Sequence, residues 1–233
     1  MLYSVCIATY NGANFIEAQL HSIISQIPDN CEIIISDNNS TDDTVKIIKS
    51  FSDSRISVIH YNQKSITGNF ENALNNCKGD IIYLSDQDDI WLPNKFKLLA
   101  SALKHHDIVV GDCIITNGSL IETERSFIKK NRSSTGFLAN IIKNSYIGCC
   151  MAFNRKILNH ALPFPKNIPM HDWWIGLVGE VYGKPIILKE ATLLYRRHGS
   201  NNSMSSEKST ITLSKKIEYR FILLKSLLER IMF

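Results

Sequence analysis

The stretch Ile81-Ile82-Tyr83-Leu84-Ser85-Asp86-Gln87-Asp88-Asp89 decides how the rest of the chain is interpreted. Its apolar first half predicts a buried strand, and its second half places three carboxylates where that strand ends. Such oxygen ligands suit a hard cation such as Mg²⁺, which keeps one or two protein carboxylates and takes further ligands from phosphates. One interpretation is therefore a metal site for a phosphorylated substrate. The other is a plain polar turn, because Asp and Ser are also common after strands.

Length and composition indicate a globular protein. The chain has 233 residues, of which 44% are hydrophobic and 21% are charged, as expected for one large domain or one domain with a tail. No apolar stretch is as long as a membrane span, and residues 1–7 lack the basic head and long apolar run of a signal peptide. We therefore expect a cytosolic protein.

Cysteine spacing and charge argue against two classes of site. The six cysteines contain no CxxC pair, which favours reduced thiols and argues against a zinc site. The formal charge is +4, and residues 207–233 hold six Lys or Arg against three Glu, so the body of the chain is nearly neutral. A broad nucleic-acid-binding surface is not indicated.

Short apolar runs alternate with helix-like stretches in the first half of the chain, as in a βαβ pattern. Strands are predicted at residues 3–8, 32–36, 56–61 and 80–84, and helices at 14–25, 41–50 and 68–76. Ser40 or Thr41 is expected to cap the second helix, with Asp42 and Asp43 in its first turn. Strands separated by helices form parallel crossovers, so the central sheet should be mainly parallel and should bind ligands beyond the carboxyl ends of its strands.

The second half of the chain is less regular. Helices are predicted at 93–104, 137–144 and 172–180, strands at 108–112 and 149–154, a mobile polar loop at 118–134 and a linker at 200–210. From Leu213 to Ile231, apolar residues recur at spacings of three and four. Basic residues lie among them, namely Lys215, Lys216, Arg220, Lys225 and Arg230. This pattern predicts an amphipathic basic helix.

Polar loops follow four of the predicted strands, at residues 9–12, 37–42, 64–69 and 86–89. In a parallel sheet these loops can meet at one edge, because each lies at the carboxyl end of a strand. None contains a Walker A sequence or a GxGxxG dinucleotide fingerprint. The loops therefore predict a nucleotide site that belongs neither to an ordinary ATPase nor to a dehydrogenase.

Taken together, these loops resemble glycosyltransferase family 2. The matching runs are VCIATYNG at 5–12, SDNNSTD at 36–42, LSDQDDIW at 84–91, GCCMAF at 148–153, HDWW at 171–174 and YRRHGSN at 195–201. Six motifs in the family's order are far more specific than a single DxD motif. The resemblance implies the α/β GT-A fold over residues 1–202, with a nucleotide-sugar half at about 1–112 and an acceptor half at about 113–202. Residues 203–233 would form the linker and basic helix.

The resemblance implies that the first half binds the nucleotide of a nucleotide-diphosphate sugar. The residues implied for base and ribose are Thr9, Tyr10, Asn11, Asp37, Gly68 and Asn69. Two alternatives stay open at this point. Asp37 also fits a helix cap or a turn, and the pair Gly68 and Asn69 also fits a plain helix start.

Asp86 and Asp88 correspond to the acidic residues of the DxD motif, with Gln87 between them on the nucleotide-sugar side. The resemblance places Asp86 near the ribose and Asp88 on Mn²⁺ or Mg²⁺, which bridges the pyrophosphate and stabilises the departing nucleotide diphosphate. Asp89 is interpreted as support for the loop. His198 matches a late histidine that adds a metal or phosphate contact in related enzymes, or else it is a surface residue of an Arg-rich loop.

Asp172 corresponds to the family's catalytic base, which takes the proton of the acceptor hydroxyl as that oxygen attacks the anomeric carbon opposite the diphosphate. One such displacement inverts the anomeric centre. Burial should raise the pKa of this carboxylate, with Trp173 and Trp174 as the expected apolar wall. We expect one tryptophan in the core and one on the acceptor side. His171, also on the acceptor side, stands where many relatives have Glu.

The resemblance predicts an inverting, metal-dependent glycosyltransferase that uses a UDP- or dTDP-sugar to extend a lipid-linked bacterial surface polysaccharide, such as O-antigen. The basic helix would hold it at the anionic cytoplasmic face of the inner membrane, unless that helix packs on the catalytic domain or on a second subunit. One rival is a sugar nucleotidyltransferase, which would want a Gly-rich, basic loop after the first strand. The other is a non-catalytic carbohydrate- or nucleotide-binding module, against which the intact acidic residues argue.

Overall fold

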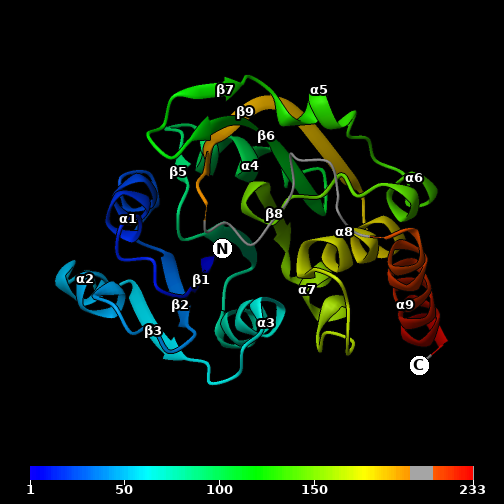
Figure 1. Cartoon of the computed structure of the whole chain (residues 1–233), viewed down its shortest axis with the longest axis horizontal. Coiled ribbons are helices and arrows are strands. Elements are labelled where there is room, and N and C mark those ends of the chain that lie inside the picture. Colours follow the sequence, from blue (N-terminus) through cyan, green and yellow to red (C-terminus); the bar gives the residue numbers. More distant parts are fainter. Residues whose placement is uncertain (200–211, 233) are drawn as a thin grey trace.

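A computed structural model describes residues 1–199 and 212–232 and shows one central sheet with helices on both faces (Figure 1). Within these described residues the sheet has nine strands, in the order β3-β2-β1-β4-β8-β6-β9-β5 with β7 paired to β6. The linker predicted at residues 200–210 lies outside the described residues.

The first half of the chain forms the parallel part of this sheet, as predicted. Its elements are β1 (Tyr3–Thr9), α1 (Ile16–Ile24), β2 (Cys31–Asp37), α2 (Thr44–Ser50), β3 (Ile56–His60), α3 (Ile66–Asn76) and β4 (Ile81–Asp86). The pairs β1–β2, β1–β4 and β2–β3 are all parallel. Side chains alternate between two apolar clusters: along β1, Cys6 packs towards α3, whereas Val5 and Ile7 pack towards α1. Burial on both faces explains the unbroken apolar runs of these strands.

Helix α2 begins later than the sequence predicts. The expected cap at Ser40 or Thr41 and the acidic first turn were wrong, because the first helical residue is Thr44. The late start of α2 is explained by a contact with a segment distant in sequence. The carboxylate of Asp42 accepts hydrogen bonds from the backbone N–H groups of Ala13 and Thr44, at 3.0 and 3.1 Å. This carboxylate ties the segment before the helix to the loop after β1.

The second half completes the sheet with mixed strand directions. Its elements are β5 (Ile90–Trp91), α4 (Lys95–Ala102), β6 (Ile108–Asn117), β7 (Glu122–Glu124), α5 (Phe127–Asn131), α6 (Phe137–Ile142), the 3-10 turn η1 (Gly148–Cys150), β8 (Met151–Asn154), α7 (Arg155–Ala161), α8 (His171–Tyr182) and β9 (Pro185–Arg197). Strand β8 runs antiparallel to β4 and β6, whereas β9 is parallel to β6.

Several features of this half differ from the prediction. Strands β5 and β9 and helix α7 were not expected, and the segment 118–134 carries β7 and α5 instead of forming only a loop. Strand β9 is hard to recognise because exposed Lys189 and Glu190 interrupt its apolar pattern beside a register shift. Helix α5 is fixed by Asp112, whose carboxylate accepts hydrogen bonds from the Ser126 hydroxyl and the Ile128 N–H.

The predicted C-terminal helix is present as α9 (Leu213–Met232), which lies beside α8 and α6 (Figure 1). Buried Leu223 and Leu227 join the core, and Arg230 donates hydrogen bonds to the carbonyls of Leu162 and Pro163. One side of α9 therefore packs on the rest of the protein. Another side exposes Leu213, Ile217, Phe221, Leu224, Leu228, Ile231 and Met232, here called the α9 stripe. Among the described residues, no helix combines the length and apolarity needed to cross a bilayer.

Candidate active site

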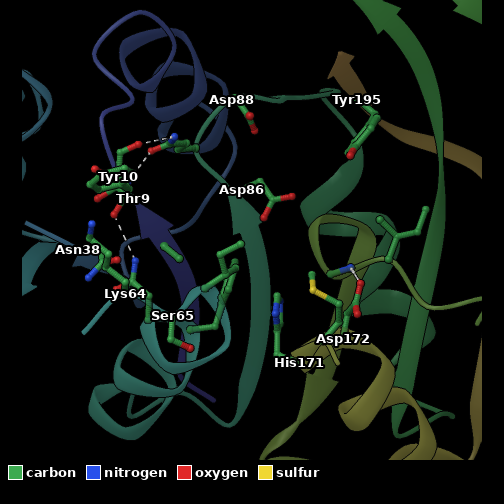
Figure 2. A pocket seen from close by; sticks show the side chains of 18 residues that line it. Thr9, Tyr10, Asn38, Lys64, Ser65, Asp86, Asp88, His171, Asp172 and Tyr195 are labelled. Carbon is green, nitrogen blue, oxygen red and sulfur yellow. Dashed lines mark hydrogen bonds between the residues drawn. The ribbon is translucent and has the colours of Figure 1, made fainter. Parts of the chain in front are cut away.

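A pocket of about 520 Å³ opens at the carboxyl edge of the parallel strands (Figure 2). All four polar loops singled out in the sequence contribute to its lining, as the parallel arrangement predicts. Its lining residues are Ala8, Thr9, Tyr10, Asn38, Lys64, Ser65, Ile66, Asn69, Phe70, Asp86, Gln87, Asp88, Ile147, Gly148, Met170, His171, Asp172 and Tyr195. In Figure 2, Asn38, Lys64 and Ser65 lie at one end and Asp172 at the other, with Asp86 and His171 between.

The loop after β1 and the acidic loop after β4 are joined by Gln87. Its Oε1 accepts a hydrogen bond from the N–H of Tyr10 at 2.9 Å, and its Nε2 donates to the Tyr10 carbonyl at 3.1 Å. A Cβ added at Gly12 would lie 2.3 Å from the same Oε1, so this close approach requires glycine. The two loops therefore form one wall of the pocket.

Three residues implied for the nucleotide do not line the pocket, namely Asn11, Asp37 and Gly68. Asp37 is buried and accepts hydrogen bonds from the hydroxyls of Thr9 and Ser40, at 2.9 and 2.6 Å. Asn11 joins the loops after β1 and β2, because its Oδ1 accepts a hydrogen bond from the Thr41 N–H. Gly68 lies so close to the Tyr61 side chain that a Cβ there would clash with it. The lining residues Asn38, Lys64, Ser65 and Tyr195 were not singled out, although each lies in or beside a quoted loop or motif.

Asn69 does line the pocket. Its Nδ2 donates a hydrogen bond to the Thr9 carbonyl at 3.2 Å, which fixes the amide. Its Oδ1 is buried and has no partner within the described part of the chain. A buried acceptor in this position is an expected partner for a donor group on a ligand.

Asp86 and Asp88 line the pocket, with Asp86 nearer its centre in Figure 2. Asp88 Oδ2 is 2.9 Å from Nε2 of His198, so the two residues predicted to share a metal are neighbours. Burial, and then the charges of Asp88 and Asp172, raises the pKa of Asp86 to about 7. Asp89 accepts a hydrogen bond from the backbone of Arg196 at 3.0 Å, so it connects the acidic loop to β9.

The chemistry of these groups fits a hard divalent cation. Asp86, Asp88 and His198 offer oxygen and imidazole donors, which suit Mg²⁺ or Mn²⁺. A second set, Asp86, Asp89 and Cys149, brings its ligand atoms within 4.8 Å of one another. The pKa of the Cys149 thiol is well above its usual range because of its hydrogen bond to Cys150 and its burial. A protonated thiol is a poor ligand for these cations, so donor chemistry favours the set containing His198. Geometry favours the other set, because among the described residues only Asp86, Asp89 and Cys149 bring three ligand atoms within 4.8 Å of one another.

Asp172 occupies the first turn of α8, where the helix dipole favours a negative charge. Its carboxylate accepts hydrogen bonds from the N–H groups of Trp173 and Gly148, at 2.6 and 3.2 Å. Burial outweighs these contacts and raises the pKa of Asp172 to about 6. The result is an oriented carboxylate that is ionised at neutral pH and more basic than an ordinary aspartate.

The two tryptophans occupy different environments. Trp174 is fully buried and donates to the Ala161 carbonyl, as expected for the core residue of the pair. Trp173 donates to the Asn140 carbonyl and faces Arg220 of α9. Neither is among the residues that line the pocket, so the acceptor-side role of a tryptophan stays a prediction. The pocket beside Asp172 is walled by residues such as Ile147, Gly148 and Met170.

Sequence comparison identifies relatives over most of the chain. The model of the family "Glycosyl transferase family 2" matches residues 4–162. The dTDP-rhamnosyl transferase RfbG of Shigella flexneri is 30% identical over 212 residues, which cover 83% of this chain and 72% of RfbG. The UDP-Glc:alpha-D-GlcNAc-diphosphoundecaprenol beta-1,3-glucosyltransferase WfgD of Escherichia coli is 29% identical over 178 residues, covering 74% of this chain and 68% of WfgD.

Solved structures share the fold. TarS 1–349 of S. aureus, in complex with UDP-GlcNAc, superposes with a TM-score of 0.72 at 19% identity. The match covers 99% of this chain and 72% of the TarS chain. The mannosyltransferase PcManGT of Pyrobaculum calidifontis, in complex with GDP-Man and Mn²⁺, superposes with a TM-score of 0.67 at 19% identity. The match covers 85% of this chain and 58% of the PcManGT chain. The expected GT-A fold is therefore confirmed, although this chain spans only part of the length of these proteins. From the family match and the RfbG alignment, the chain belongs to glycosyl transferase family 2.

Proposed function

We propose that this glycosyltransferase transfers a sugar, with inversion, from a UDP- or dTDP-sugar to a hydroxyl of a lipid-linked oligosaccharide during surface polysaccharide assembly. The observation that carries the proposal is the placement of Asp86, Asp88 and Asp172 in one pocket (Figure 2). Asp86 is the last residue of β4 and Asp88 lies in the loop that follows, at the edge where nucleotides bind in parallel sheets. The third carboxylate stands across the pocket, where an acceptor can meet it.

The nucleoside would occupy the end of the pocket formed by Thr9, Tyr10, Asn38 and Ser65. The unpartnered Oδ1 of Asn69 accepts a hydrogen bond, and uracil and thymine both offer an imide N–H. WfgD and RfbG are named for UDP-Glc and a dTDP-linked sugar, which carry these two bases. Asn69 offers an acceptor to such a base, and the names of the relatives favour a uridine or thymidine nucleotide as donor.

Asp86, Asp88 and His198 would hold Mn²⁺ or Mg²⁺. When bound, such a cation neutralises charge on the diphosphate and favours its departure. Asp86 must lose its proton to serve as a ligand, and its raised pKa couples metal binding to pH. The neighbouring carboxylates of Asp88 and Asp172 repel the charge of Asp86, and a cation relieves this repulsion.

Asp172 is the proposed general base. Backbone hydrogen bonds to both of its oxygens hold the carboxylate in place at the start of α8. It accepts the proton of the acceptor hydroxyl while that oxygen attacks the anomeric carbon, the bond from that carbon to the diphosphate breaks, and the configuration inverts. A pKa of about 6 keeps Asp172 ionised at neutral pH and raises its basicity.

The acceptor suggests that the enzyme acts at the cytoplasmic face of the inner membrane, held there by the α9 stripe. The sequence predicts that the basic residues of α9 supply the membrane affinity, and the fold favours its apolar residues instead. Most basic residues of α9 already have partners: Lys215 pairs with Glu218, Lys225 with Glu229, and Arg220 and Arg230 donate to carbonyls of the domain. The apolar stripe therefore contributes most of the membrane affinity and the basic residues contribute less.

Point substitutions test this membrane contact better than removing α9, because Leu223 and Leu227 belong to the core. Phe221→Ser and Leu228→Ser should reduce co-sedimentation with vesicles that contain anionic lipid. Ile121→Ser, at an equally exposed apolar residue outside α9, is the matched control. Unchanged sedimentation of the α9 variants contradicts the membrane role. Dissociation of a dimer by those variants would instead assign the stripe to a second subunit.

The activity itself is tested by screening UDP- and dTDP-sugars for transfer to a synthetic lipid-pyrophosphate sugar. The anomeric configuration of the product, read by NMR, tests inversion. A nucleotidyltransferase would instead release pyrophosphate from a nucleoside triphosphate and a sugar phosphate. Binding of nucleotide sugars without turnover, across all acceptors, would favour a non-catalytic module.

A further inference from the structure

His171 is a buried polar side chain in the pocket whose polar atoms are not satisfied by the fold. It is 3% exposed, and within residues 1–199 and 212–232 neither ring nitrogen has a hydrogen-bond partner. The ring is held by stacking on Phe70, with centroids 3.9 Å apart and planes 22° apart. Buried polar groups without partners are rare in folded proteins, and each lowers stability. The arrangement therefore indicates that a bound ligand supplies the hydrogen-bond partners of the His171 ring.

The position of the ring identifies which part of a ligand it meets. In Figure 2, His171 lies below Asp86 and beside Asp172, away from Asn38 and Lys64. Under the proposed function, the diphosphate lies at the acidic loop and the attacking hydroxyl lies at Asp172. The anomeric carbon must lie between them, so the sugar being transferred lies over this part of the pocket.

The protonation state of the ring identifies the chemistry it recognises. Burial lowers the pKa of His171 to about 3, so the imidazole is neutral at working pH. A neutral imidazole has one donor and one acceptor nitrogen. Sugar hydroxyls both donate and accept, so they match this pair. A carboxylate at this position would instead add a negative charge to a pocket that already holds Asp86 and Asp172.

We propose that His171 binds hydroxyl groups of the transferred sugar and thereby contributes to donor-sugar specificity. This inference rests on the proposed function and moves His171 from the acceptor side, where its motif placed it, to the donor side. The stacked Phe70 fixes the plane of the ring, so the direction of its hydrogen bonds is set before the sugar arrives. A site built in this way rejects a sugar that lacks the matching hydroxyl.

Two variants separate hydrogen bonding from packing. His171→Phe keeps a ring against Phe70 and removes both nitrogens, whereas His171→Gln keeps a neutral donor and acceptor. Calorimetry should show that the Phe variant binds UDP-glucose, or dTDP-glucose if thymidine is preferred, roughly 10- to 100-fold more weakly. Its affinity for UDP or dTDP should equal that of the wild type, and the Gln variant should recover much of the loss. The Phe variant should also unfold at a higher temperature, because it buries no unpartnered atoms.

Deoxy analogues of the same nucleotide sugar identify the hydroxyl. The wild type should lose affinity for one analogue, and the Phe variant should bind that analogue and the parent sugar equally. An equal loss for UDP and UDP-glucose, or no loss for either, would overturn the inference, as would a change confined to the KM of the acceptor. These binding measurements do not require turnover. A wild type that binds UDP-glucose more tightly than UDP but transfers nothing would contradict the proposed function alone.

Discussion

Replacing Asp172 by Asn should stabilise the protein while removing its activity. The pKa of Asp172 is about 6 in the folded protein because burial disfavours the charged form, against an ordinary value of about 3.9. The folded state therefore holds this proton more tightly than the unfolded state does. The resulting stabilisation is complete below pH ~4 and is lost as the pH rises through ~6. At neutral pH the protein carries an ionised carboxylate that the fold disfavours.

The magnitude follows from the shift. A difference of about two pKa units, at 1.36 kcal/mol per unit, corresponds to roughly 3 kcal/mol. Water reaches the pocket beside Asp172, so a gain of about 1–3 kcal/mol is expected for Asp172→Asn at pH 8. For a chain of this length, that is a rise in melting temperature of about 2–10 °C. The turnover number should fall by roughly 10²- to 10⁴-fold, with nucleotide-sugar affinity nearly unchanged.

Urea unfolding of both proteins at several pH values between 4 and 8 measures the effect. The free-energy difference should be largest at pH 8 and vanish near pH 4. Asp29→Asn, at an exposed aspartate, is the control and should show no such dependence. A difference that does not change with pH would refute the argument from burial. Near-normal turnover of Asp172→Asn would move the base elsewhere, with His171 tested next.

Three further predictions concern the same pocket. EDTA should abolish transfer, and Mn²⁺ or Mg²⁺ should restore it; full activity in EDTA would exclude a required metal. The Asp88→Ala variant should lose most activity while its circular dichroism spectrum stays native. Because Asp172 must be ionised to act, kcat/KM should fall as the pH drops through ~6, and a profile that is flat down to pH 5 would contradict its pKa. Since the pKa of Asp86 is about 7, Mn²⁺ binding at pH 6.5 should release protons, seen as a buffer-dependent binding enthalpy; a buffer-independent enthalpy would exclude Asp86 as a ligand.

The sequence by itself determined the parallel half of the sheet, the acidic site and helix α9. These features are local or strictly ordered along the chain. Buried parallel strands appear as unbroken apolar runs, and the polar residues that follow them must lie at one edge of the sheet. The apolar spacing of α9 likewise needs no knowledge of its surroundings. For these reasons Asp86 and Asp88 could be predicted at the edge of the sheet, whereas Asp172 was assigned to the same pocket by the resemblance of its motif to the family.

Only the tertiary structure decided which motif residues face that pocket. Asp37 and Trp174 lie within matching motifs, yet both are turned away into the fold. Strand β9 forms because β6 pairs with it, although its own pattern is interrupted. The raised pKa of Asp172 and the unpartnered ring of His171 arise from burial by segments distant in sequence. Burial and hydrogen-bond partners depend on long-range packing, which local sequence patterns do not encode.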